Sequence, residues 1–178
     1  MAVLNKIDKA AEEKGSFLVT LWQFVKFIAV SLGAMIVQFV LLNTLNLIPA
    51  IKDLYAQDFS WWVFAYPVAI GGLGYFIVSN VANIIAQIVA FFINKEKTFN
   101  SGANVAVTLP IYIVFTIALI CFSAWLNPTL KEVFIGFDWC NEDLAKNIAT
   151  MICSAVQFFL YFPVDKILFH KKKEEKAE

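Results

Sequence analysis

The fold of this chain follows from the segment Ala90–Phe99, which reads AFFINKEKTF and places an amide and two ammonium groups where a long apolar run meets water. Three further amides precede Asn94, at Asn80, Asn83 and Gln87. The successive intervals from Asn80 to Asn94 are three, four and seven residues. This spacing aligns the four amides along one side of a single helix. Because polar groups in lipid are costly unless they face protein or water, we expect this side to face the interior of a helical bundle.

The composition is that of a membrane protein. The chain has 178 residues, of which 60% are hydrophobic and 16% charged, and its mean hydropathy is +0.71. Soluble globular proteins average about 25% charged residues, and a soluble fold of this length could not bury so much apolar surface. No basic, aromatic-interleaved face lies outside the apolar runs, so the sequence gives no support for nucleic-acid binding. The three cysteines have no metal-ligand spacing, and no metal site is predicted.

Four apolar runs are long enough to cross a hydrocarbon core, which takes about 20 helical residues. They are Trp22–Leu45, Gly71–Asn94, Val105–Leu126 and Ile148–Phe169. The predicted fold class is therefore all-α, a polytopic membrane protein with four transmembrane helices. We divide the chain into an N-terminal segment (1–21), the transmembrane domain (22–170) and a lysine- and glutamate-rich tail (171–178). The aromatic segment Trp61–Tyr66 is expected either to lie at the membrane surface or to begin a long tilted helix.

The distribution of lysine predicts the orientation in the membrane. All 14 basic residues are lysines, and eleven of them fall on one side of the predicted spans: Lys6, Lys9, Lys14, Lys26, Lys95, Lys97, Lys166, Lys171, Lys172, Lys173 and Lys176. Cytoplasmic loops are enriched in basic residues. Both termini and the short middle loop are therefore predicted to be cytoplasmic, in a multi-pass protein of the cell (cytoplasmic) membrane.

The two halves of the chain resemble one another. Lys26-Phe27 and the residues after it align with Ile111-Tyr112, and Ala90–Phe99 aligns with Leu160–Phe169. Each half would hold two spans, so the halves would have the same orientation, as in a parallel repeat. This pattern predicts two hairpins that face each other across a shared interior.

The segment Ala90–Phe99 also resembles the Asn-Phe-x-x-Asn-Arg-x-x-Thr-Phe signature that closes the second helix of GtrA-like membrane proteins. Asn94 and Lys95 stand at its Asn-Arg pair, and Thr98 and Phe99 at its end. The opening around Lys26 is similar to that family's basic-Phe-apolar-Gly start. The departures are alanine for the usual asparagine at position 90, serine for glycine at 31, lysine for the aromatic residue at 97, and lysine for arginine throughout.

The resemblance implies a role in the glycosylation of cell-surface polysaccharides. Such proteins are proposed to move polyprenyl-phosphate-linked sugars, made on the cytoplasmic face, across the membrane beside a separate membrane-associated glycosyltransferase. The implied partners are therefore the membrane, the sugar lipid and this glycosyltransferase. A homo-oligomer stays open as well, because four thin helices offer little room for a saccharide.

The predicted substrate-binding residues combine amides with ammonium groups: Asn94, Lys95, Lys97, Lys26, Asn83, Gln87 and Asn80. Asn94 and Lys95 are expected to contact the head group, while the other amides would line its route, with Gln38 and Gln157 from neighbouring helices. Amides both donate and accept, which suits sugar hydroxyls, and lysines hold phosphate as point charges. The alternatives are hydrogen bonds that only join helices and lysines that only set topology or contact anionic lipid.

Catalysis and cofactor binding have little support in the sequence. It contains no evident nucleophile–base pair, paired carboxylates, metal-ligand cluster or phosphate-binding glycine loop. Asp165 and Lys166 are expected to form an ion pair at the membrane surface, with a coupling carboxylate as the alternative. Two other functions stay open: a membrane adaptor that anchors a polyprenyl-phosphate glycosyltransferase, and a small multidrug-type exporter.

Overall fold

A computed structural model describes residues 2–170, without the side chains of residues 2–5, 142, 143 and 146. The predicted tail at 171–178 lies outside the described residues. The elements follow one another as α1 (Ala2–Lys14), α2 (Ser16–Leu45), α3 (Pro49–Lys52), the 3₁₀ helix η1 (Asp53–Ala56), β1 (Phe59–Trp61), β2 (Phe64–Tyr66), the 3₁₀ helix η2 (Val68–Ile70), α4 (Gly72–Ile93), the π-helix η3 (Asn94–Thr98), α5 (Val105–Ile135) and α6 (Glu142–Leu168).

Four helices in the described part of the chain are long and apolar enough to cross a membrane, which confirms the predicted mostly helical membrane fold. Their spans are Ser16–Leu45, Gly72–Thr98, Val105–Ile135 and Asn147–Leu168. The first span begins before the predicted Trp22. The chain is already helical from Ser16, because the break between α1 and α2 lies at Gly15, whose φ is 108°. The third continues past the predicted Leu126 and includes Pro128, so this proline does not end the helix.

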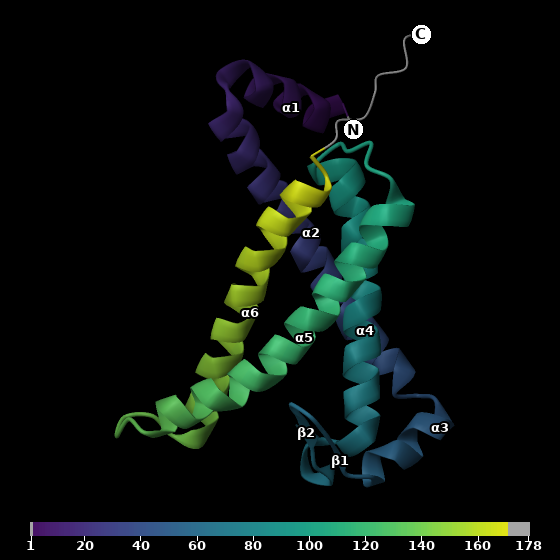
Figure 1. The fold of residues 1–178 in the computed structure, drawn as a ribbon, viewed down its shortest axis with the longest axis vertical. Helices are drawn as coiled ribbons and strands as arrows, with labels where there is room; N and C mark the ends of the chain where they lie inside the picture. The colour runs from purple at the N-terminus through teal and green to yellow at the C-terminus, as the bar shows by residue number, and fades with distance from the viewer. Residues whose placement is uncertain (1, 171–178) are drawn as a thin grey trace.

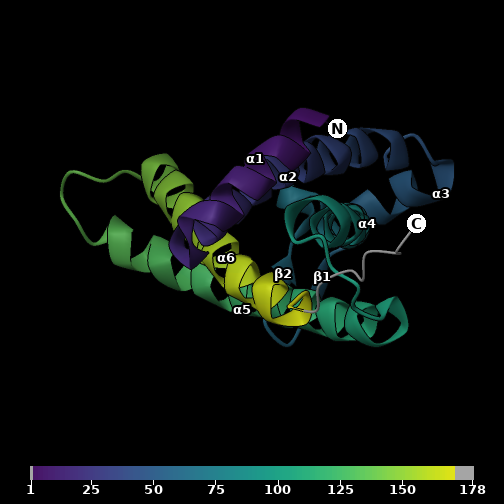
Figure 2. The same ribbon diagram turned by 90° about the horizontal axis from the view of Figure 1, so that it is seen from above.

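The spans form two helix pairs, α2 with α4 and α5 with α6 (Figure 1). Viewed from above, α4 is nearly end-on, with α2 on one side and α5 on the other (Figure 2). The start of α2, the end of α6 and the α4–α5 connection lie at one end of the molecule, which we call the lysine end. Lys166 Nζ of α6 donates to Thr20 Oγ1 of α2 at 2.6 Å, which joins these two helices at the lysine end.

An aromatic cluster joins the two pairs near the lysine end. Its buried members are Phe27, Phe91, Phe99, Ala103, Tyr112, Leu119, Tyr161 and Phe169. Three pairs of these residues are the ones that the predicted repeat aligns: Phe27 with Tyr112, Phe91 with Tyr161, and Phe99 with Phe169. Equivalent positions from the two halves therefore meet in one core. This agreement supports the repeat, which stays a prediction.

The contact between α2 and α4 is made of small side chains. Ala86 and Ala90, one turn apart on α4, are buried against Ala34 of α2. Small residues at a four-residue spacing allow two helix backbones to approach closely, which is how helices associate where lipid gives no hydrophobic driving force.

The far end of the molecule carries α3 and a β-hairpin (Figure 1). Phe59 pairs with Tyr66 and Trp61 with Phe64 in this hairpin, so the predicted alternative of a helix beginning at Trp61 is wrong. The chain then enters α4 through Gly71 and Gly72, both with positive φ. A Cβ on Gly72 would lie 2.2 Å from the carbonyl oxygen of Gln57, whose position is fixed because it accepts a hydrogen bond from Leu73 N at 2.8 Å.

Replacing Gly72 by alanine should therefore destabilise the protein. Overpacking of this kind costs about 1–3 kcal/mol, and the positive φ adds strain. We expect a lower thermal unfolding midpoint in mild detergent. Gly33→Ala is the matched control, since a Cβ there meets nothing within 4 Å. Equal midpoints for the two variants would contradict this account of the α4 entry.

The predicted orientation can be tested by labelling single cysteines in a protein whose native cysteines are replaced by alanine. Lys97 is exposed at the lysine end and Ser60 is exposed in the hairpin. The positive-inside rule predicts that a membrane-impermeant thiol reagent labels Ser60→Cys in intact cells and labels Lys97→Cys only after permeabilisation. The reverse pattern would invert the topology.

Candidate functional site

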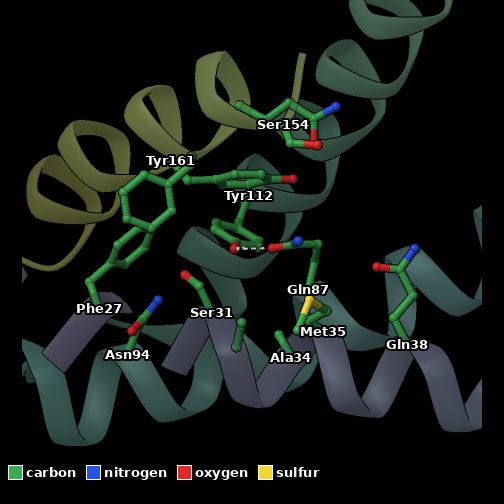
Figure 3. A pocket seen from close by; sticks show the side chains of 13 residues that line it. Phe27, Ser31, Ala34, Met35, Gln38, Gln87, Asn94, Tyr112, Ser154 and Tyr161 are labelled. Carbon is green, nitrogen blue, oxygen red and sulfur yellow. Dashed lines mark hydrogen bonds between the residues drawn. The ribbon is translucent and has the colours of Figure 1, made fainter. Parts of the chain in front are cut away.

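A polar cavity of about 160 Å³ lies inside the bundle, between the two helix pairs (Figure 3). All four spans contribute to its lining, which consists of Phe27, Ser31, Ala34, Met35, Gln38, Gln87, Ala90, Asn94, Tyr112, Ser154, Gln157, Phe158 and Tyr161. Eight of these residues carry a hydroxyl or a carboxamide, and none carries a charge. The cavity therefore offers neutral hydrogen-bond donors and acceptors within the spans of a membrane protein.

Several polar side chains of the lining are positioned by hydrogen bonds between helices. Tyr112 donates its hydroxyl to Gln87 Oε1 at 3.0 Å, which joins α5 to α4 (Figure 3). Tyr161 donates to Thr116 Oγ1 at 3.1 Å, and Gln157 donates to Ser123 Oγ, both between α6 and α5. These bonds fix the orientation of the side chains that face the cavity.

Asn94 lines the cavity on its lysine-end side and connects it to a buried acid. Its Nδ2 donates to Asp165 Oδ2 at 2.8 Å, and its Oδ1 accepts from Thr98 Oγ1 at 2.9 Å. All three side chains are at most 1% exposed. Because both ends of the amide are bonded, Asn94 is held in one orientation, and it links α4 to α6.

The local backbone at Asn94 is a π-turn. The Phe99 amide donates to the Asn94 carbonyl at 2.9 Å, a five-residue step where an α-helix would take four. Such turns insert one extra residue into a helix and are frequent at functional sites. Here the turn places the side chains of both Asn94 and Thr98 inside the bundle, where they contact each other.

The predicted amide stripe is only partly continuous in the structure. Gln87 and Asn94 line the cavity, and Gln38 and Gln157 join them from α2 and α6, as expected. Asn80 and Asn83 lie outside the lining. Asn80 donates instead to the carbonyl of Phe76 in its own helix, at 2.7 Å. The stripe thus contributes its lysine-end half to the cavity.

The predicted lysines lie outside the cavity lining as well. Lys95 is 8% exposed, and its Nζ donates to the Ser101 carbonyl at 3.1 Å, which holds the α4–α5 connection against η3. Lys26 pairs with Asp8 of α1 at 2.8 Å. Lys97 is exposed at the lysine end. The amides that line the cavity and the predicted lysines therefore occupy neighbouring regions of the molecule, and they do not share one pocket.

The predicted ion pair between Asp165 and Lys166 is wrong. Adjacent residues on a helix point about 100° apart, so Asp165 turns into the bundle, where it is 0% exposed, while Lys166 donates a hydrogen bond to Thr20.

The sequence prediction also missed Tyr112 and Tyr161 as residues of the cavity lining. The repeat alignment carried a signal for them, since it pairs them with the aromatic residues Phe27 and Phe91.

Comparisons with protein-family models, with curated proteins and with solved structures find no match for this chain. The likeness to GtrA-like proteins therefore rests on the motif around Asn94 and on the four-span layout. In the described part of the chain, His, Cys, Asp and Glu side chains form no group that would hold a metal ion.

Replacing Asn94 by alanine should destabilise the bundle, because it leaves Asp165 without its hydrogen-bond donor. Leaving a buried polar group unsatisfied costs about 1–3 kcal/mol, and more for a charged group. Asn80→Ala is the control on the same helix: Asn80 bonds only its own backbone, so its loss should change stability by less than about 0.5 kcal/mol. Thermal unfolding in detergent measures both. Equal effects would mean that the Asn94–Asp165 bond contributes nothing.

Proposed function

We propose that the protein moves a polyprenyl-phosphate-linked sugar across the cytoplasmic membrane, for glycosylation of a cell-surface polysaccharide. The observation that carries the proposal is the uncharged, hydroxyl- and amide-lined cavity, which draws on all four spans. The glycosyl transfer itself would be done by a separate membrane-associated enzyme. The resemblance of Ala90–Phe99 to the GtrA-like signature supports the same conclusion.

The chemistry of the lining suits a sugar. The barrier to moving such a lipid is the transfer of hydroxyls and phosphate through hydrocarbon, where each unpaired polar group costs several kcal/mol. Gln38, Gln87 and Gln157 each carry a donor and an acceptor, so they can replace water around hydroxyls whose orientation changes in transit. Tyr112 and Tyr161 add aromatic faces to the same wall.

The size of the cavity limits what enters it. Pockets for drug-sized ligands have volumes of about 300–1,000 Å³. A cavity of about 160 Å³ therefore fits a single sugar ring rather than an oligosaccharide. The apolar prenyl chain needs no enclosure, because it is compatible with the lipid around the bundle.

The lysine end supplies the attraction for the phosphate. Lys97 is exposed there, and Lys95 lies close behind the surface, beside Asn94 in the chain. Ammonium groups hold phosphate without requiring one fixed geometry. A head group would thus meet the lysines first and the amides next, which matches the order of these groups along the molecule.

The lining also favours this proposal over a multidrug-type exporter. A lipophilic cation needs a negative counter-charge in its binding site, and no carboxylate is among the lining residues. The membrane-adaptor alternative makes no use of a polar cavity at all, so transport measurements separate it from the proposal.

The test uses purified protein in liposomes that hold a polyprenyl-phosphate sugar, whose exposure in the outer leaflet is followed with an impermeant enzyme that cleaves the sugar. The protein should speed the exchange between leaflets above the rate in protein-free vesicles. The double variant Gln87→Leu with Gln157→Leu keeps the side-chain volume and removes two amides. We expect it to be about tenfold slower, which corresponds to about 1.4 kcal/mol on the barrier.

Asn83→Leu is the matched control, since Asn83 lies on α4 outside the cavity lining, and it should keep the wild-type rate. A wild-type rate equal to that of empty vesicles would refute translocation and favour the adaptor. Proton-driven efflux of lipophilic cations would favour the exporter. Equal slowing by the Asn83 and glutamine variants would show that the cavity is not the route.

A further inference from the structure

Asp165 is a buried acid for which the proposed transport route has no use. It is 0% exposed, it lies within the fourth span, and it is not in the cavity lining. One of its oxygens, Oδ2, accepts a hydrogen bond from Asn94 at 2.8 Å. The other, Oδ1, has no hydrogen-bond partner among the described residues.

Three described lysines near Asp165 in the chain or at the lysine end are engaged elsewhere. Lys166 donates to Thr20, Lys95 to the Ser101 carbonyl, and Lys26 to Asp8. Within the described residues, Asp165 takes part in no ion pair. Among the described residues, the titratable groups that interact with it are the phenols of Tyr112 on α5 and Tyr161 on α6, and a phenol, with an ordinary pKa of about 10, is neutral at physiological pH.

A carboxylate in this environment would be a buried, uncompensated negative charge. Charges in a membrane interior are expensive unless paired, and the penalty after relaxation is still several kcal/mol. The neutral acid avoids that penalty and retains the hydrogen bond from Asn94. The packing around Asp165 therefore favours the protonated form.

The helix that carries Asp165 has a weak point next to it. Pro163 lies two residues before Asp165 inside α6 and lacks an amide hydrogen, so the helical bond to the Phe159 carbonyl is missing. Helices kink at such positions. Pro163 is therefore the position at which a bend would separate the last turn of α6 from η3 without disturbing the contacts of the helix body with α5.

We propose that Asp165 is a proton-binding site, which holds its proton while the end of α6 packs on η3 and releases it to water at the lysine end when the two separate. The site takes up one proton when it closes. By linkage, low pH then favours the closed packing and high pH favours the open one. The proposal concerns the end of α6 and holds whether or not the cavity carries a sugar.

Two measurements on the full chain in lipid vesicles test the site. Infrared spectroscopy with ¹³C-carboxyl aspartate should show the C=O band of a protonated aspartic acid at neutral pH, and this band should be absent in Asp165→Asn. Spin labels at Asn100→Cys and Ile167→Cys, both exposed positions, report the separation of the two ends. In the wild type this separation should grow as pH rises from about 5 to about 9.

In Asp165→Asn, which cannot ionise, the separation should stay at its low-pH value throughout. Asp138→Asn is the control, because Asp138 is exposed in the α5–α6 connection and its loss should leave the pH response unchanged. An ionised Asp165 at neutral pH in the wild type, or a pH response retained in Asp165→Asn, would overturn the proposal. The wild-type infrared titration decides the matter even if the variant fails to fold, and neither measurement depends on lipid transport.

Discussion

The structure depends on one constraint: hydrocarbon cannot hydrate a polar group, so polar side chains within the spans rely on partners in the protein. The four spans meet this constraint in different ways. The α5–α6 pair is joined by a series of bonds that includes Tyr161 to Thr116 and Asn127 to Thr150. The α2–α4 pair is joined by alanine contacts and needs no such bonds. Between the pairs, the Asn94–Asp165 bond and the aromatic cluster form the connection at the lysine end.

The cavity follows from the arrangement of the four spans as two separate helix pairs. Where two pairs are each tightly packed internally but meet each other chiefly at one end, the interface away from that end is left incompletely filled. Its walls retain the polar groups that face inward, among them Gln87 from one helix pair and Gln157 from the other. A site with amides on both sides can pass a hydroxyl from one wall to the other through bonds of similar strength, which suits passage better than tight retention.

Hydropathy and residue spacing predicted the spans well because the lipid environment constrains length and composition directly. The spacing of Asn80, Asn83, Gln87 and Asn94 predicted a common side of one helix, and two of the four, Gln87 and Asn94, line the cavity. It gave no information on where neighbouring helices cover that side, and so it did not separate Gln87, which meets Tyr112, from Asn80, which bonds its own helix.

The charged residues were the least predictable part of the site. Lys26 and Lys95 have partners that come from α1 and from the folded-back α4–α5 connection, and no local pattern encodes these contacts. For Asp165 the error had the same origin. Its neighbour Lys166 suggested a local pair, whereas the helix geometry directs the two side chains to different surroundings. The hairpin at Phe59–Tyr66 was missed because its aromatic residues suit either a strand or a membrane surface.

The π-turn at Asn94–Thr98 has a consequence for how this chain is compared with others. It accommodates one residue more than an α-helical turn, so a chain that lacks that residue would have a regular helix there. The side chain before the deletion would then be rotated by about 100° relative to everything after it. If a sequence alignment has a gap of one position at this point, a different residue faces the interior in the two chains. An asparagine aligned with Asn94 by residue type alone would then point in another direction.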